Sequence, residues 1–160
     1  MSFDSNWEKE VYSKNKQINE YPFEWIVSSS KRYISKYKNK KVVELGSGTG
    51  NNLLFFNKLG FKEVVGIEGS KSAVKITRNK FKQIKNIKII LDDFTNTNFA
   101  NNYFDLCVDR GSITHNDKQD VKKIVNNIHK FLKPGGFFFH VYLVRNITLI
   151  VKKSFFLKKK

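Results

Sequence analysis

Short apolar runs alternate along the chain with longer segments that are apolar on only one side. The runs are rich in Val, Ile, Leu and Phe, as expected for strands that are covered on both faces. They occupy residues 41–45, 63–67, 87–91, 103–108 and 137–143. The segments between them repeat apolar residues about every 3.6 positions, which predicts helices. The clearest of these helices cover residues 51–59, 70–83 and 117–132. This alternation favours a doubly wound, mostly parallel α/β sheet with right-handed crossovers.

Residues at the ends of these elements support the assignment. Ser70 and Asp117 are good N-caps for two of the helices. Gly60 is a natural C-terminal stop, and Pro134-Gly135-Gly136 is expected to end the last helix before the fifth strand. A further helix is predicted to open at Tyr21-Pro22, with the proline in its first turn.

The chain of 160 residues is long enough for one hydrophobic core and shows neither an internal repeat nor a second domain. We expect a single domain over residues 1–160 with three parts. Residues 1–40 would form an N-terminal lid and helix region, residues 41–143 the core, and residues 144–160 a tail that is both basic and apolar.

Composition narrows the class of protein. The single cysteine, Cys107, excludes an internal disulfide, and no Cys/His cluster has the spacing of a metal site. The N-terminus lacks the basic and apolar regions of a secretory signal, and no apolar run approaches the ~20 residues that a membrane span needs. We therefore expect a cytoplasmic protein with no transmembrane segment and no metal, whose oligomeric state the sequence leaves open.

The net charge of +16 admits an anionic partner such as RNA or a phosphorylated substrate. However, the basic residues are nearly all lysines, spread from Lys9 to Lys160, which indicates a general compositional bias. The charge alone therefore does not identify a nucleic-acid-binding protein.

The turn after the first strand carries the most specific pattern. Residues 42–51 read VVELGSGTGN, an apolar run that ends in an acid and three alternating glycines. A dinucleotide-binding turn requires G-x-G-x-x-G, and here Asn51 occupies the third glycine position. The spacing E-x-G-x-G-x-G therefore indicates a nucleoside-type ligand other than a dinucleotide.

Acidic residues follow the other strands at the same edge of the sheet. Parallel sheets of this kind bind ligands outside the carboxyl ends of their strands. Glu68 ends the second strand, Asp92 and Asp93 end the third, and the loop 109–115 follows the fourth. Glu68 lies about as far beyond the glycines as an acid that binds ribose hydroxyls would lie.

These motifs together resemble a class I S-adenosylmethionine-dependent methyltransferase over residues 40–140. The resemblance is carried by ELGSGTG at 44–50, VGIE at 65–68, DF at 93–94, FDL at 104–106 and LKPGG at 132–136. It implies a Rossmann-like sheet and S-adenosyl-L-methionine as the cofactor. The family sheet has seven strands, so the five strands recognised here are incomplete relative to it, and the chain resembles a small-molecule type truncated at its C-terminus.

The resemblance also implies which residues contact the cofactor. Backbone of the glycine turn would approach its methionyl and ribose parts, Glu68 would hold the ribose hydroxyls, and Asp93 would bind the adenine amino group. Trp7 and Tyr12 lie where such enzymes often have a lid. The full set of implied cofactor contacts is Glu44, Gly46, Ser47, Gly48, Gly50, Glu68, Gly69, Asp93, Phe94, Asp109 and Arg110.

The reaction implied is in-line transfer of a methyl group, for which the enzyme must hold a nucleophile ~3–3.5 Å from the methyl carbon. His115 is the candidate base, with a purely structural loop histidine as the alternative; His140, inside a strand, is expected to be structural. Arg110 would bind an anionic group of the acceptor, or else pair with Asp109 or Asp105.

The acceptor is less well defined than the cofactor. The region after the fourth strand lacks the Asn/Asp-Pro-Pro-aromatic motif of base N-methyltransferases, so we expect a small-molecule acceptor, such as a sugar or another metabolite, rather than nucleic acid. The alternative that the protein is an RNA methyltransferase stays open because of the positive net charge.

Residues 144–160 are too few for the helix and two strands that the family would place there. Either the fifth strand is an exposed edge, or the tail covers it as one added strand or a short helix. Because of the short tail, two alternatives stay open: the chain is an inactive remnant that binds the cofactor, or it is a non-catalytic partner subunit.

Overall fold

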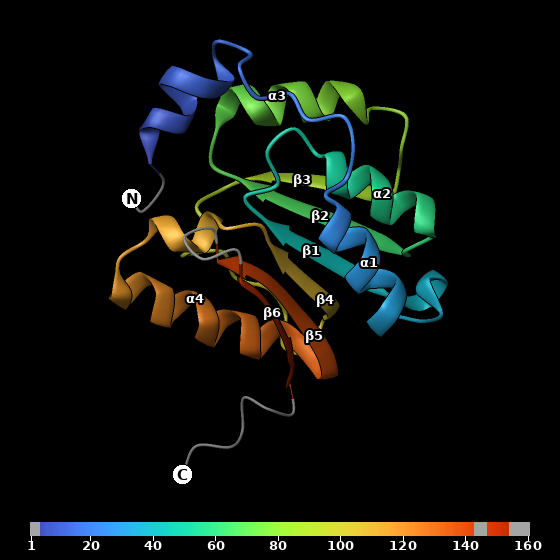
Figure 1. Ribbon diagram of the computed structural model, residues 1–160. Coiled ribbons are helices and arrows are strands. Elements are labelled where there is room, and N and C mark those ends of the chain that lie inside the picture. The colour runs from blue at the N-terminus through green and yellow to red at the C-terminus, as the bar shows by residue number, and fades with distance from the viewer. Residues whose placement is uncertain (1–3, 143–146, 154–160) are drawn as a thin grey trace.

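Six strands form one sheet in the order β3-β2-β1-β4-β5-β6 (Figure 1). The computed structural model describes residues 4–142 and 147–153. The strands are β1 (Lys41–Leu45), β2 (Glu63–Glu68), β3 (Ile87–Leu91), β4 (Phe104–Asp109), β5 (Leu132–Tyr142) and β6 (Ile147–Lys152). Neighbouring strands are parallel except β5 and β6, which pair antiparallel. The strand order changes direction between β1 and β4, which is where such sheets bind ligands.

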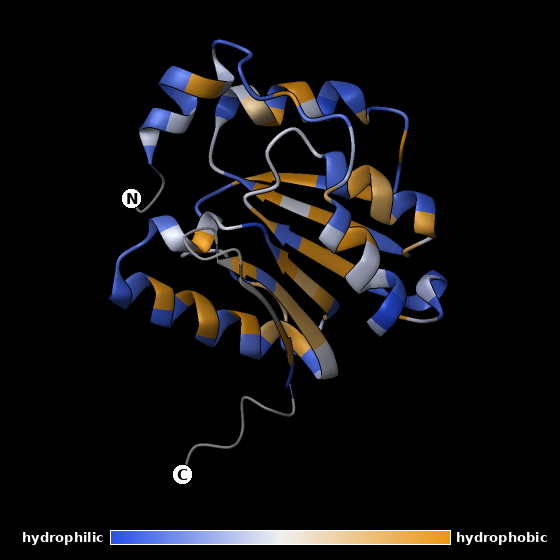
Figure 2. Ribbon diagram, in the orientation of Figure 1, coloured by the Kyte–Doolittle hydropathy of each residue, from blue (hydrophilic) through white to orange (hydrophobic). Residues whose placement is uncertain are grey.

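Helices cover both faces of the sheet, so the central strands are apolar on both sides (Figure 2). The helices are α1 (Glu24–Tyr33), α2 (Asn51–Leu59), α3 (Lys71–Lys80) and α4 (Lys118–Phe131). Alternate residues of β1 serve the two faces. Val42 belongs to the core cluster that contains Phe56 of α2, and Val43 belongs to the cluster that contains Ile124 of α4.

The expected caps are present. The Ser70 hydroxyl accepts the Ala73 N–H at 3.0 Å, and the Asp117 carboxylate accepts the Asp120 N–H at 2.8 Å. Gly60 ends α2 with φ at +90°. These local bonds explain why the predicted starts of α3 and α4 agree with the structure to the residue.

The C-terminal half of the sheet differs from the expectation in two ways. The tail supplies β6, so β5 is not an exposed edge, and the added strand is the alternative that the structure shows. In addition, β5 begins at Leu132, directly after α4, so residues 134–136 lie inside this strand rather than between helix and strand. The pairing with β4 shifts register between Phe104 and Leu106, which accommodates this irregular start. Leu143, the expected end of this strand, lies outside the described residues.

The expected start of α1 was wrong. Its N-cap is Phe23, so Pro22 precedes the helix instead of lying in its first turn. Backbone groups on both sides of this proline are bound by the start of α2, because the Asn51 side chain donates to the Tyr21 carbonyl and the Phe23 N–H donates to Asn52. These long-range bonds hold residues 21–23 against the start of α2.

The first described segment forms a short π-helix, η1 (Trp7–Tyr12), beside the N-terminus of α3 (Figure 1). None of its residues is buried. Within the described ranges, the structure contains no helix that is long and apolar enough to span a membrane.

Candidate functional site

A pocket opens at the carboxyl ends of β1, β2, β3 and β4 and encloses about 930 Å³, part of it open to solvent. It brings together most of the residues expected from the sequence: Glu44, Gly46, Ser47, Gly48, Glu68, Gly69, Asp93, Phe94, Arg110 and His115. Gly50 and Asp109, which were expected to contact the cofactor, are not among the residues that line it.

The glycine turn forms one wall of the pocket. Two of its positions have no room for a side chain. Gly46 and Gly48 have φ of +63° and +53°. A Cβ atom at Gly46 would lie 2.6 Å from the Ser112 side chain, and one at Gly48 would lie 2.7 Å from the Tyr12 hydroxyl oxygen. The bare backbone of the turn therefore packs closely against Ser112 and Tyr12, and both glycines line the pocket.

Glu68 fixes the geometry of the turn. Its carboxylate accepts the N–H of Gly48 at 2.8 Å and the N–H of Ser70 at 2.8 Å, and the residue is only 4% exposed. Burial raises the pKa of Glu68, although these backbone hydrogen bonds oppose the shift. Each carboxylate oxygen has a second lone pair, so the residue still has acceptor capacity for ligand hydroxyls.

Glu44 is the most strongly perturbed acid in the pocket. It is 2% exposed, and Oε1 accepts a hydrogen bond from Asn52 at 2.6 Å. Among the described residues, Oε2 has no hydrogen-bond partner. Burial raises the pKa of Glu44 to about 8, so the side chain is largely protonated at neutral pH.

At the end of β3, two aspartates form a turn that reaches the pocket. Asp93 accepts hydrogen bonds from the Thr95 N–H at 3.0 Å and from the Thr95 hydroxyl at 2.8 Å. Asp92 accepts one from Thr97 at 2.9 Å. Phe94 lies between these residues and also lines the pocket. The turn thus presents acids and a ring at the place where the adenine contacts were expected.

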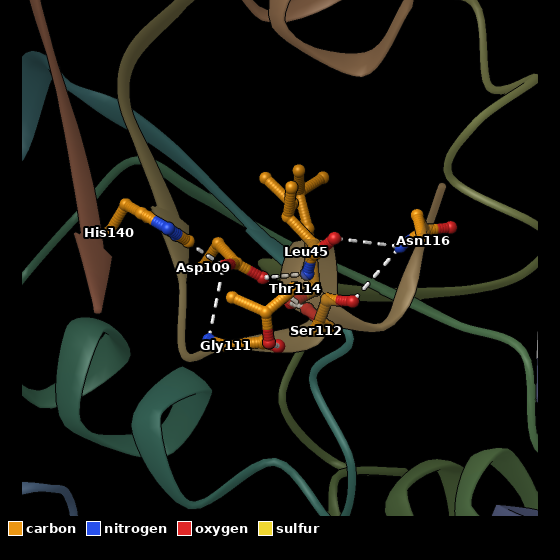
Figure 3. A network of polar contacts seen from close by, with 8 residues as sticks. Leu45, Asp109, Gly111, Ser112, Thr114, Asn116 and His140 are labelled. Atoms are coloured by element: carbon orange, nitrogen blue, oxygen red, sulfur yellow. Dashed lines mark hydrogen bonds and ion pairs between the residues drawn. The ribbon is translucent and has the colours of Figure 1, made fainter. Parts of the chain in front are cut away.

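Asp109 organises the loop after β4 instead of facing the pocket (Figure 3). It is fully buried, and its carboxylate accepts the N–H groups of Gly111 at 3.0 Å and Ile113 at 3.1 Å. The same carboxylate contacts Nδ1 of His140 at 2.6 Å and is hydrogen-bonded by the Ser112 hydroxyl. Its acceptor capacity is taken up by this network, which explains why Asp109 is not among the residues that line the pocket.

The loop that Asp109 holds carries Arg110 and His115 into the pocket. The guanidinium carbon of Arg110 lies 3.7 Å from the centroid of the Phe23 ring. The ring of His115 meets that of Trp7 edge to face, with centroids 5.8 Å apart. Rings from the N-terminal region therefore contact both candidate residues of the acceptor side.

The N-terminal segment closes over the pocket through a bond that the sequence did not indicate. The Glu8 carboxylate accepts hydrogen bonds from the Ser70 hydroxyl at 2.6 Å and from the Ser72 N–H at 3.1 Å. These hydrogen bonds lower the pKa of Glu8. Trp7 and Tyr12 lie in this segment and line the pocket, and their role as a lid stays a prediction. Phe23 and Asn52 were also missed as lining residues, and the asparagine pair after the glycine turn was the only available signal.

An open α/β sheet with a glycine turn, an acid after β2 and a pocket at the switch point defines a class of nucleoside-cofactor enzymes. Comparison with known proteins identifies the family within this class to which the chain belongs. The family model described as "Methyltransferase domain" matches residues 42–136. The chain belongs to this family and is a class I S-adenosylmethionine-dependent methyltransferase.

Two curated relatives illustrate the range of acceptors. EEF1A lysine methyltransferase 2 of Danio rerio is 32% identical over 109 residues, which are 63% of this chain and 47% of that protein. Phosphoethanolamine N-methyltransferase of Plasmodium falciparum (isolate 3D7) is 27% identical over 99 residues, 62% of this chain and 37% of that protein. The chain thus spans about half the length or less of these relatives.

A solved structure shows the same fold. Phosphoethanolamine N-methyltransferase 1 of Haemonchus contortus, in complex with phosphoethanolamine and S-adenosylhomocysteine, has a TM-score of 0.65 and 17% identity. The match covers 72% of this chain and 24% of that one. The family and its fold make S-adenosylmethionine the cofactor, whereas the residue roles expected from the sequence stay predictions.

Proposed function

We propose that this chain transfers the methyl group of S-adenosylmethionine to the nitrogen of a small amine. The observation that carries the proposal is that one pocket holds two sets of residues. The glycine turn and the strand-end acids form one set. His115 and the rings of Trp7, Tyr12 and Phe23 form the other. The first set suits the cofactor, and the second suits an amine acceptor.

The residues present fit the cofactor. The turn exposes backbone without side chains to the pocket at Gly46 and Gly48, and Glu68 keeps lone pairs for ribose hydroxyls. Glu44, whose Oε2 has no hydrogen-bond partner among the described residues, lines the same pocket. When bound, the cofactor supplies a methyl group that a sulfonium centre activates. The protein then has to bind, orient and exclude water, which requires no metal ligand.

The amine is supported by what the two relatives act on and by the rings. The names of the two relatives above specify lysine and phosphoethanolamine, both of which carry a primary amine. Aromatic faces attract ammonium groups. Only the neutral amine has a lone pair for methyl transfer, so a base has to take a proton. His115 is the candidate for this role because it lines the pocket beside Trp7.

The charges of the lining argue against a polyanion in the pocket. The protein has a net charge of +16, yet no lysine is found among the lining residues. Their only guanidinium belongs to Arg110, whereas the carboxyl groups of Asp4, Glu68, Asp92 and Asp93 line the same pocket together with the largely protonated Glu44. An RNA strand would be repelled where an amine would be attracted. A nucleic-acid acceptor is therefore a weaker proposal than a small amine.

A lysine side chain of a protein is the second candidate, favoured by the relative at 32% identity and by the rim of the pocket. Gln17 and Asn19 line the pocket, while Ile18 and Tyr21 of the same segment are 49% and 81% exposed. Exposed apolar side chains beside a pocket are suited to contact a protein surface.

An assay with radiolabelled cofactor tests both candidates. It measures transfer of the labelled methyl group to pooled small amines, to matched alcohols and to protein. We expect label in the amine pool, and Glu68→Gln should abolish it together with cofactor binding. Glu63→Gln, a strand acid that is bound by Lys88 outside the pocket, is the matched control. Label in alcohols or in protein alone would refute the small-amine proposal. Calorimetric binding of the cofactor without transfer to any acceptor would instead indicate a non-catalytic subunit.

A further inference from the structure

Arg110 occupies an unusual position for a cationic side chain. It is partly buried, lines the pocket and lies over the ring of Phe23 at 3.7 Å from guanidinium carbon to centroid. Stacking on a ring face orients the plane of a guanidinium but leaves its N–H groups at the edge available. The ring itself is anchored, because the Phe23 N–H donates to Asn52 at 3.1 Å.

Within the described part of the chain, the N–H donors of Arg110 have no acceptor. Across residues 4–142 and 147–153, no carboxylate lies within ion-pair distance of this guanidinium and no hydrogen bond joins it to another group. Asp109 and Asp105, the alternative partners predicted from the sequence, are bound to other groups. Asp109 contacts His140 at 2.6 Å, and Asp105 pairs with Lys133 at 2.8 Å.

Leaving a partly buried charge without a partner is unfavourable unless a ligand supplies one. Burial lowers the pKa of Arg110, while the nearby acids Tyr12 and Glu44 oppose that shift. Both of these groups also line the pocket, so the guanidinium faces the same space as the rest of the site.

We propose that Arg110 binds an oxyanion carried by the methyl acceptor, so that the acceptor is a small amine with a carboxylate or phosphate group. This inference rests on the proposed function, because it presumes that the acceptor occupies this pocket. The planar fork of a guanidinium matches both oxyanions in a bidentate arrangement. The aromatic rings and His115 then receive the amine end, and Arg110 sets the orientation of the molecule between them.

Binding to the protein saturated with S-adenosylhomocysteine tests the subsite directly. The probes are O-phosphoethanolamine and β-alanine, which carry a phosphate and a carboxylate, and ethanolamine, which carries neither. Affinities come from calorimetry, and the ¹⁵N resonance of the Arg110 side chain reports contact independently of turnover. The variants are Arg110→Met, which removes the charge, and Arg110→Lys, which keeps it but loses the fork.

Arg32→Met is the matched control, because Arg32 also lies near a ring, 5.7 Å from the Tyr33 centroid, but outside the pocket. We expect the native protein to bind at least one anionic amine about tenfold or more tightly than ethanolamine. Arg110→Met should abolish this preference, Arg110→Lys should retain part of it, and the control should retain all of it. The affinity of the control variant for S-adenosylhomocysteine should stay within about twofold of that of the native protein. Circular dichroism confirms that each variant is folded.

Equal binding of anionic and neutral amines by the native protein would overturn the proposal, as would a preference that survives Arg110→Met. If Arg110→Met instead weakens S-adenosylhomocysteine but not methylthioadenosine, which lacks the amino-acid part, the guanidinium binds the cofactor carboxylate and the proposal is wrong. The proposed function fails separately. Arg110-dependent binding of an anionic amine without methyl transfer to any amine would support the subsite and refute the proposed function. Methyl transfer to neutral and anionic amines without preference would support the proposed function and refute the subsite.

Discussion

Glu44 provides a sharp test of how the pocket is built. Its side chain is 2% exposed, and burial raises the pKa of this carboxyl from 4.5 to about 8. Between these two pH values the folded protein holds a proton that the unfolded chain has released. The free energy of unfolding therefore decreases as pH rises through this window. Glu44→Gln removes the titration but keeps an oxygen that accepts the hydrogen bond from Asn52.

The magnitude follows from the shift. A difference of one pKa unit corresponds to about 1.4 kcal/mol, so a shift from 4.5 to about 8 corresponds to roughly 5 kcal/mol over the whole window. Relative to the variant, the native protein should lose about 3 kcal/mol of unfolding free energy between pH 5.5 and pH 8. This is a large fraction of the stability of a single domain, which is typically about 5–15 kcal/mol.

Urea unfolding followed by tryptophan fluorescence, at pH 5.5, 6.5, 7.5 and 8.5, measures the slope in both proteins. The native-minus-variant difference should decrease steadily with pH, because other titrating groups cancel in the comparison. Glu24→Gln, at an exposed position in α1, serves as the control and should behave like the native protein. Parallel slopes for the native protein and Glu44→Gln would refute the account of Glu44 as a buried, protonated acid.

Two further substitutions test the turn and the loop. His140→Phe removes the 2.6 Å contact to the buried Asp109 and should lower the free energy of unfolding by about 3 kcal/mol, with partial recovery in His140→Asn; an unchanged urea midpoint would contradict this. Gly48→Ala places a Cβ atom 2.7 Å from the Tyr12 hydroxyl oxygen at a position with φ of +53°, so the pocket wall has to shift and the affinity for S-adenosylhomocysteine, measured by calorimetry, should decrease about tenfold. Gly60→Ala, at φ +90° but with only an ordinary contact to Lys38 at 3.9 Å, should cost only about 1 kcal/mol of stability and leave that affinity unchanged; equal losses of affinity in both alanine variants would show that backbone strain alone explains the effect.

Much of the core could be predicted because its signals are local. The run at 87–91 is β3 to the residue, and the Ser70 and Asp117 caps lie within three residues of the N–H groups that they bind. The glycine turn and Glu68 were found for a similar reason, since parallel strands bring their carboxyl ends to one edge and the position of a residue in the strand is enough to place it.

Features that depend on distant partners could not be predicted. Pro22 was expected inside a helix because nothing nearby shows that Asn51 and Asn52 bind the backbone around it. Asp109 was expected to face the ligand because its position after β4 says nothing about the direction of its side chain. That direction is set by His140, 31 positions away in sequence. The Glu8 contact to Ser72 spans 64 positions and had no sequence signal.

Ser70 joins the N-terminal segment to the pocket in a way that has a thermodynamic consequence. Its hydroxyl donates to Glu8, and its N–H donates to Glu68, so one residue is shared by the lid and by the acid at the end of β2. A ligand that holds Glu68 in this geometry also favours the docked segment, and linkage requires the reverse effect to be equal. Docking of the segment that carries Glu8 should therefore raise the affinity for the nucleoside, and the bound nucleoside should favour docking of the segment by the same factor.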